Sequence, residues 1–163
     1  MRRISIILAS LILVFSPAYG KKMPKAKVSN EATKYLDASF GVYDAMQKKI
    51  HSLAEVGYME YESSSLLASH LEEHGFTVER GVAGIPTAFV ASFGSGSPVI
   101  GLLAEYDALP GMSQDTVSYK KAVTEGAAGH GCGHNLLGTG SVAGAVAISK
   151  WLAEGHSGTV KSC

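Results

Sequence analysis

Two stretches near the start of the chain space their apolar residues three or four positions apart, which is the period of an α-helix. The first stretch runs from about Ala32 to Leu53 and the second from about Ser63 to His74. Gly75 follows the second stretch, at the position where a left-handed residue commonly ends a helix. The pattern therefore predicts two amphipathic helices, the second of which turns Leu67 and Leu71 toward a core.

Short runs of β-type residues come next. They are Phe76–Val78, Ala88–Ala91 and Val99–Leu103, and turn-rich segments separate them. The third run is apolar at every position, which is typical of a central strand covered on both faces. A fourth strand is predicted to begin at Thr159.

A third helix is predicted over about 135–154. One side of it carries only small residues, so this side must lie close against a sheet; they are Gly140, Ala143, Gly144 and Ala147. Helices before and after a sheet with a buried central strand predict a three-layer α/β arrangement. Because sites in such sheets form where loops leave the carboxyl ends of strands, the loop after Leu103 becomes the first place to look for function.

The N-terminus has the pattern of an export signal. Arg2 and Arg3 precede the apolar run Ile4–Phe15, and small residues follow at the positions that a signal peptidase requires. Twelve helical residues rise only about 18 Å, whereas the hydrocarbon core of a membrane is about 30 Å thick. We therefore expect a signal peptide at 1–20, a polar leader at 21–30, and an exported protein, periplasmic or extracellular, with no stable membrane anchor after cleavage.

Charge and composition narrow the function further. The 163 residues contain 14 basic and 14 acidic side chains, so the chain lacks the basic excess of a nucleic-acid-binding protein and we expect no nucleic-acid partner. The hydrophobic fraction of 46% is ample for a folded core. A disulfide between Cys132 and Cys163 is not favoured, because the first lies in a Gly/His cluster and the second is the last residue.

Two clusters could carry chemistry: Glu105–Gly111, directly after the third strand, and His130–Asn135, just before the third helix. In the second cluster Cys132 and His134 flank Gly133, which lets the backbone bend so that both side chains turn toward one cation. Sulfur with imidazole suits zinc or another late divalent metal. The spacing fits equally well a glycine-rich turn whose histidines merely cap the next helix.

Asp107 lies at the strand exit and also has two interpretations. Its carboxylate could accept a hydrogen bond from a metal-binding imidazole, which would fix the tautomer of that ring. It could instead form a turn before Pro110 by bonding to its own backbone. Local sequence does not decide between them.

The two clusters together carry a family resemblance. The segments GIPTAFVASFGSGSPVIGLLAEYDALPG and GHGCGHNLLGTGSVAGAVAISKWL resemble the zinc-dependent amidohydrolases of the aminoacylase and glutamate carboxypeptidase family, most closely its aminobenzoyl-glutamate hydrolase branch. The likeness spans roughly 33–161. It implies a three-layer α/β/α sandwich of the zinc-peptidase type, incomplete at the C-terminus, with 31–163 as the N-terminal part of the catalytic domain.

The resemblance also implies an activity, which is metal-dependent hydrolysis of the amide bond in small N-acyl or N-aroyl amino acids or dipeptides. Cys132 and His134 match the metal ligands of that branch, and Asp107 matches the aspartate that supports the metal site. The implied cofactor is a divalent metal, zinc before manganese or nickel, with two ions in the complete enzyme. Glu105 stands where the wider family has a ligand histidine and is left out of the set, while His130 is expected only to shape the loop.

One part of the family pattern has no counterpart here. Members carry an adjacent glutamate pair, one serving as base and one as ligand, after the strand that begins here at Thr159, and this sequence reads Ser162–Cys163 at that place. We therefore expect the chain alone to be inactive and expect a homodimer only for the full-length form. The alternative is a non-catalytic truncated remnant with at most weak metal binding.

Two other functions are weaker candidates. A thiol hydrolase would use Cys132 as nucleophile with His130 or His134 as base, which requires the pairs to lie within hydrogen-bond reach. A dinucleotide site would use the Gly-x-Gly-x-x-Ala pattern at 138–143, but that pattern needs a strand immediately before it and an acidic residue about 20 positions later. The sequence offers neither context.

Overall fold

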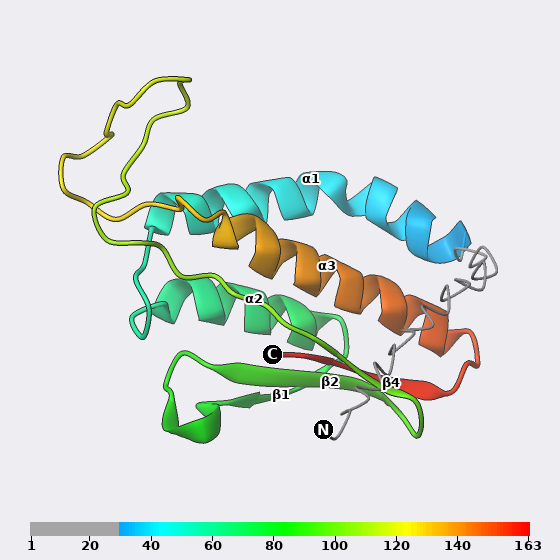
Figure 1. The fold of residues 1–163 in the computed structure, drawn as a ribbon. Coiled ribbons are helices and arrows are strands. Elements are labelled where there is room, and N and C mark those ends of the chain that lie inside the picture. The colour runs from blue at the N-terminus through cyan, green and yellow to red at the C-terminus, as the bar shows by residue number, and fades with distance from the viewer. Residues whose placement is uncertain (1–29) are drawn as a thin grey trace, which may run out of the picture.

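The computed structural model describes residues 30–163. The predicted signal peptide at 1–20 and the predicted leader, apart from Asn30, lie outside the described residues. The described part of the chain contains three long helices and one four-stranded sheet (Figure 1).

The helices lie close to where the apolar spacing predicts them. Helix α1 spans Asn30–Leu53, α2 spans Tyr61–Glu73 and α3 spans His134–Ala153. Gly75 has a φ of +84° and its N–H donates to the carbonyl of Glu72, so the left-handed end predicted for the second helix is confirmed. The largest apolar side chains that the helices bury completely are Ile50, Leu67, Leu71, Val142 and Val146.

The sheet is mixed. Its strands are β1 (Thr77–Arg80), β2 (Phe89–Ser95), β3 (Val99–Leu102) and β4 (Gly158–Ser162), arranged in the order β1-β2-β4-β3. The pairs β1–β2 and β2–β4 are antiparallel, whereas β3 and β4 run parallel. Parallel neighbours need a long crossover, and here the loop after β3 together with α3 supplies it. A short 3-10 helix, η1 (Val82–Gly84), lies between β1 and β2.

The prediction that Val99–Leu103 is a central strand covered on both faces is wrong for the described residues. Strand β3 pairs only with β4 and forms an edge of the sheet, where Val99 and Ile100 are 58% and 50% exposed. The interior position belongs to β4, whose Val160 is fully buried. Apolar composition did not distinguish the two strands, because α3 returns the chain so that β4 inserts between β2 and β3.

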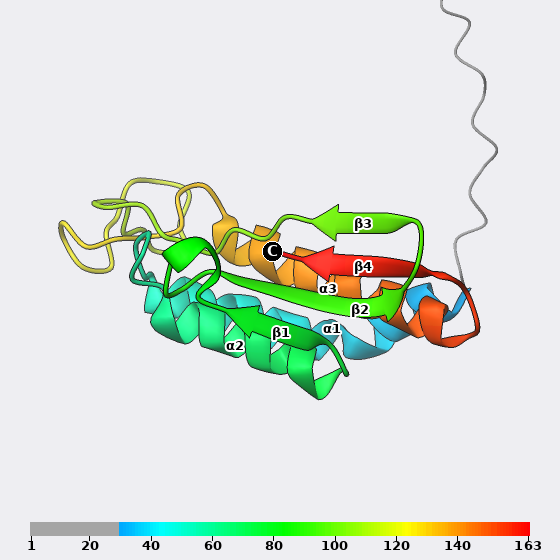
Figure 2. The same cartoon turned by 90° about the horizontal axis from the view of Figure 1, so that it is seen from below.

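All three helices lie on the same side of the sheet, as the two ribbon views show (Figures 1 and 2). Helices α2 and α3 pack against the strands, and α1 packs across α3 and α2. The α/β class predicted from the sequence is confirmed. A second helical layer on the other face of the sheet is not present among residues 30–163.

Helix α3 is the core helix of this arrangement. It is the one helix within residues 30–163 that is long and apolar enough to cross a membrane, but ten of its residues are buried in the domain. Of the small residues predicted to lie against the sheet, Gly144 does so, because a Cβ there would lie 3.8 Å from the side chain of Leu102 in β3. Ala143 and Ala147 are buried, but Gly140 has open space around it, so the prediction is wrong for Gly140. The tightest approach is that of Gly138 to the carbonyl of Glu105, just after β3.

Acid should weaken the packing of α1 on α2, because His70 is buried there without charge. The ring is 9% exposed, with Nε2 3.2 Å from the hydroxyl of Tyr43 and its centroid 4.3 Å from the ring of His74. Burial, and then the neighbouring His74, lower the pKa of His70 below its usual 6.5, while the charge of Glu73 opposes this. Below about pH 6.5 the unfolded chain therefore binds more protons than the folded chain, and stability falls as pH falls.

We expect the free energy of unfolding to decrease between pH 7.5 and pH 5.5, with a slope that approaches about 1.4 kcal/mol per pH unit for one proton. Urea unfolding at a series of pH values measures this slope. His70→Gln, which keeps a group able to bond to Tyr43, should make the slope shallower but not flat, because burial also lowers the pKa of His130. An unchanged slope in His70→Gln would contradict the assignment.

Candidate functional site

The segment that leaves β3 separates its side chains onto two sides. Tyr106 points into the core, where it is 9% exposed, stacks on Phe89 and donates its hydroxyl to the carbonyl of Thr87 at 2.6 Å. Because alternate residues of an extended chain point to opposite sides, Glu105 and Asp107 share the other side. The following backbone is held in place, since the N–H of Ala108 donates to the carbonyl of Glu55.

Helix α3 presents a matching face to this strand exit. Gly133 precedes the helix with a φ of +77°, which an L-residue rarely adopts, and His134 is the first helical residue. His134, Gly138 and Ser141 follow one another at intervals of four and three positions, so they lie on one face of the helix. The hydroxyl of Ser141 donates to the carbonyl of Leu103 at 2.6 Å, and this bond fixes the helix against the end of the strand.

The ring of His134 lies between the two carboxylates. Its Nδ1 is 2.7 Å from Oδ1 of Asp107, and its Nε2 is 2.9 Å from Oε2 of Glu105. The side chain of His134 is 17% exposed, so the contact is only partly open to water. A neutral imidazole has a single N–H and can donate to only one carboxylate, so the other nitrogen needs a proton or a metal ion to face a carboxylate favourably.

Cys132 does not join this cluster. It lies in the turn before α3 with an exposed, free thiol, and no hydrogen bond links it to His130 or His134. Within residues 30–163, no three His, Cys, Asp or Glu side chains are placed so that they could share one metal ion. The structure thus brings Asp107 and His134 into contact, whereas the thiol of Cys132 is exposed and makes no hydrogen bond with either. Cys163 is also a free, exposed thiol.

Glu105 is outside the predicted ligand set, yet the structure places it in contact with His134. A signal for it was present, because Glu105 and Asp107 are two positions apart directly after a strand. Residues with that spacing point the same way on extended backbone. If the two-residue alternation of an extended strand is continued past Leu103, it predicts that both carboxylates lie on the same side of the chain.

His130 uses both ring nitrogens on the backbone. Its Nε2 is 3.1 Å from the carbonyl of Ile50, and its Nδ1 is 3.3 Å from the N–H of Asn135, which donates to it. The ring therefore ties the end of α1 to the start of α3. These contacts agree with the expected loop-shaping role and leave neither nitrogen free for a metal.

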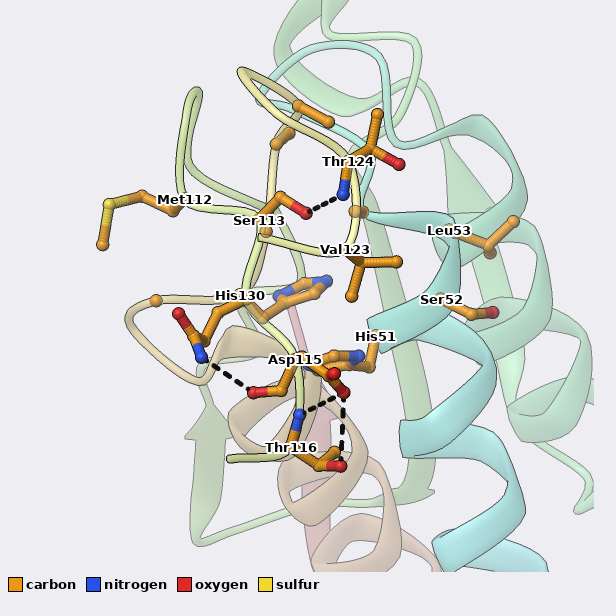
Figure 3. A pocket seen from close by; sticks show the side chains of 16 residues that line it. His51, Ser52, Leu53, Met112, Ser113, Asp115, Thr116, Val123, Thr124 and His130 are labelled. Carbon is orange, nitrogen blue, oxygen red and sulfur yellow. Dashed lines mark hydrogen bonds between the residues drawn. The ribbon is translucent and has the colours of Figure 1, made fainter. Parts of the chain in front are cut away.

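A cleft of about 690 Å³ opens next to His130, between the end of α1 and the loop that runs from Met112 to Gly131 (Figure 3). The rings of His51 and His130 lie 5.8 Å apart at its wall. Asp107, Cys132 and His134 do not line it. The cleft therefore lies beside His130 and does not include the candidate site.

The donor chemistry fits part of a metal centre. An imidazole whose Nδ1 faces a carboxylate is the usual arrangement of a metal-binding histidine, and a thiol two residues away suits the same class of late divalent metal. Catalytic zinc sites normally use three protein ligands plus water. The described residues thus match such a centre in the kind of donor, while the number of donors that converge falls short of it.

The 138–143 glycine pattern has no role in nucleotide binding here. It lies inside α3, and the segment immediately before the helix is a turn rather than a strand. The dinucleotide fingerprint needs a strand that leads directly into the glycines. The small residues instead belong to the face and flank of a packed helix.

Comparisons with known proteins identify relatives of this chain. No sequence model of a known protein family matches the chain. Over 121 residues the chain is 51% identical to one subunit of the p-aminobenzoyl-glutamate hydrolase of Escherichia coli, covering 73% of this chain and 25% of that protein. Over 92 residues it is 38% identical to thermostable carboxypeptidase 2 of Saccharolobus solfataricus, covering 55% of this chain and 23% of that protein.

A solved structure shares the fold. The chain superposes on a dinuclear metal-binding peptidase of the M20 family from Bacillus subtilis with a TM-score of 0.65 and 25% identity, covering 77% of this chain and 35% of that one. The chain spans about a quarter of the length of the curated relatives it matches. By sequence and by fold together, it belongs to the M20 family of amidohydrolases and metallopeptidases.

Proposed function

We propose that this chain supplies the first part of a metal-dependent amide hydrolase that acts on small N-acyl or N-aroyl amino acids or dipeptides. The observation that carries the proposal is the 2.7 Å contact between Nδ1 of His134 and Asp107 at the exit of β3. The relatives support the substrate class, since one is a hydrolase of an aroyl amino acid and another is a carboxypeptidase.

In this proposal His134 and Cys132 are metal ligands and Asp107 is a positioning residue. Asp107 accepts a hydrogen bond from the Nδ1–H of His134, which leaves the Nε2 lone pair for the ion and fixes the plane of the ring. Glu105 contacts that same Nε2, so ion binding there requires this contact to open. When bound, the metal polarises the scissile carbonyl and makes a water nucleophilic at neutral pH.

We further propose that the chain on its own binds the metal weakly and turns over no substrate. The support is the absence, among residues 30–163, of three donors that converge on one point. We also propose that the metal is zinc, with manganese or nickel as the alternatives. The protein is proposed to be exported, and its full-length form to be a homodimer. The competing function is a non-catalytic remnant that merely binds metal.

A segment exchange distinguishes the enzyme from the remnant. The corresponding segment of the p-aminobenzoyl-glutamate hydrolase of Escherichia coli is replaced by the matching 121 residues of this chain, which are 51% identical to it. We expect the chimera to hydrolyse p-aminobenzoyl-glutamate when a divalent metal is present, and the 163-residue chain alone to show no turnover. A folded but inactive chimera, beside an active parent enzyme, would favour the remnant.

Replacing Asp107 by asparagine should weaken metal binding about 10- to 100-fold, the usual cost of removing the carboxylate behind a ligand histidine. The amide keeps the shape of the side chain but removes the charge that fixes the Nδ1 proton. Competition of the full chain with a zinc-sensitive dye measures the affinity. Asp115→Asn is the matched control, because that partly exposed carboxylate pairs with Lys121 and does not contact His134. Equal affinities of the two variants would contradict the role of Asp107.

A further inference from the structure

A second pocket, of about 300 Å³, opens beside the candidate site and shares Glu105 and Asp107 with it. Its other walls are mostly apolar and come from the turn before α2, the turn before β2 and the strand exit. No lysine or arginine lines it within the described residues. The remaining lining residues are Gly57, Tyr58, Glu60, Ile85, Thr87, Ala88, Ala104 and Tyr106.

Glu60 is the buried charge of this pocket. Glu60 is only 8% exposed, and its Oε2 accepts a hydrogen bond from the hydroxyl of Thr87 at 2.7 Å. The other oxygen, Oε1, lies beside Gly57 at the pocket wall and has no hydrogen-bond partner among residues 30–163. Because Oε1 keeps contact with solvent at the pocket wall, a ligand that carries positive charge can reach it and pair with the carboxylate.

An acidic side chain at the start of a helix commonly accepts hydrogen bonds from the first backbone N–H groups. In α2 a residue other than Glu60 does this. Glu60 is the N-cap residue of α2, yet its side chain makes no capping hydrogen bond. Glu55 does this work instead, accepting from the N–H groups of Glu62 and Ser63 and from the hydroxyl of Ser63. Partial burial alone would raise the pKa of Glu55, but these hydrogen bonds hold it below its usual value. The helix start therefore does not need the charge of Glu60.

The neighbours of Glu60 do not neutralise it either. Burial and the nearby charge of Glu60 raise the pKa of Tyr106 to about 12, so this phenol stays neutral, and its proton is committed to the carbonyl of Thr87. His134 is already shared by Glu105 and Asp107. Because the carboxylates do not converge as a metal site would, the cation that fits this space is an organic one.

We propose that this pocket binds a primary ammonium group on the acyl part of the amide substrate, with Oε1 of Glu60 as its anchor. The apolar substituent of the acyl part then packs against Ile85 and the tyrosine rings, and the amide extends toward Asp107 and His134. The inference rests on the proposed function for the identity of the site, and it ranks substrates within that class: dipeptides and related amides with a free aliphatic amino group should bind more tightly. N-acyl and N-aroyl amino acids would bind without this contact, because they lack the charge that Glu60 would recognise.

The test compares two amides that differ only in the ammonium group, phenylalaninamide and 3-phenylpropionamide. Each is titrated into the full chain with a metal chelator present, and the backbone amide resonances of Thr87 and Tyr106 are followed by NMR. We expect phenylalaninamide to bind at least about tenfold more tightly, the effect of one charged hydrogen bond. Glu60→Gln, whose amide oxygen can still accept from Thr87, should abolish the preference, and Glu62→Gln, a change of a nearby exposed acid, should preserve it.

Equal affinities of the two amides, no binding of either, or a preference that survives in Glu60→Gln would each overturn the proposal. The first comparison needs no variant, so it stands even if Glu60→Gln fails to fold. Because the titrations exclude metal, they do not depend on the ligand roles of Cys132 and His134. Zinc titration of the same samples reports on those roles separately, which distinguishes a failure of this inference from a failure of the proposed function.

Discussion

His134→Ala is expected to abolish metal-dependent hydrolysis in the segment-exchange chimera and to weaken zinc binding by the full chain more than about 100-fold. Removing the carboxylate behind a ligand histidine typically costs about 10- to 100-fold in affinity, and removing the ring itself deletes the ligand as well as its support. In the unmodified chain both Asp107 and Glu105 contact that ring. The substitution therefore also removes the group that partners these two carboxylates. Zinc competition and initial rates with p-aminobenzoyl-glutamate measure the two effects.

His156→Ala is the control for this prediction. His156 follows the far end of α3, where its ring stacks on Trp151 at 4.0 Å and lies away from the strand exit. Its loss should leave zinc affinity and turnover unchanged. Turnover in His134→Ala within a factor of about two of the unmodified chimera would show that this imidazole is not a ligand.

Two further variants decide the rest of the ligand set. Cys132→Ser should weaken zinc binding if the exposed, free thiol turns toward the ion when it binds. Glu105→Gln should leave affinity unchanged or raise it if Glu105 merely competes for Nε2. The opposite pair of results, an indifferent Cys132→Ser and a damaging Glu105→Gln, would replace Cys132 by Glu105 as the second ligand.

Local sequence signals predicted the elements well because each has a local physical cause. The three-to-four spacing of apolar residues gives α1 and α2, and Gly75 ends α2 because it adopts a φ that other residues avoid. The placement of Asp107 beside His134 was also predictable. Asp107 follows the end of a strand and His134 lies at the start of the crossover helix, and the sequence indicates both positions.

The incorrect predictions concern features that depend on contacts between distant parts of the chain. The edge position of β3 depends on β4 entering between β2 and β3, and β4 comes only after the long loop and α3. The small-residue face of α3 was assigned to Gly140 rather than Gly138 because the rotation of a helix about its axis is fixed by what it packs on. The role of Cys132 as a ligand stays a prediction, because the structure shows only that its thiol is free and exposed.

Gly138→Ala should destabilise the domain by about 1–3 kcal/mol, the usual cost of an extra methyl group in a packed interior. A Cβ atom at this position would lie 2.7 Å from the carbonyl oxygen of Glu105 and 3.3 Å from Cβ of Tyr106, and backbone cannot move aside as cheaply as the end of a side chain. Gly140→Ala is the matched control, because nothing lies within 4 Å of its Cβ. It should stabilise the domain by about 0.5–1 kcal/mol, the ordinary gain of alanine over glycine inside a helix.

The opposite signs of these two changes test the geometry on which the site depends. Gly138 lies one turn after His134 on the same face of α3, so the absence of a side chain there is what lets the helix approach the strand exit closely enough for the imidazole to meet both carboxylates. Gly138→Ala must push Glu105 and Asp107 away from His134, so it should weaken zinc binding along with stability, whereas Gly140→Ala should alter stability alone. Urea unfolding and zinc competition on the same samples measure both, and a Gly138→Ala variant as stable as Gly140→Ala would mean that α3 does not lie against the strand exit.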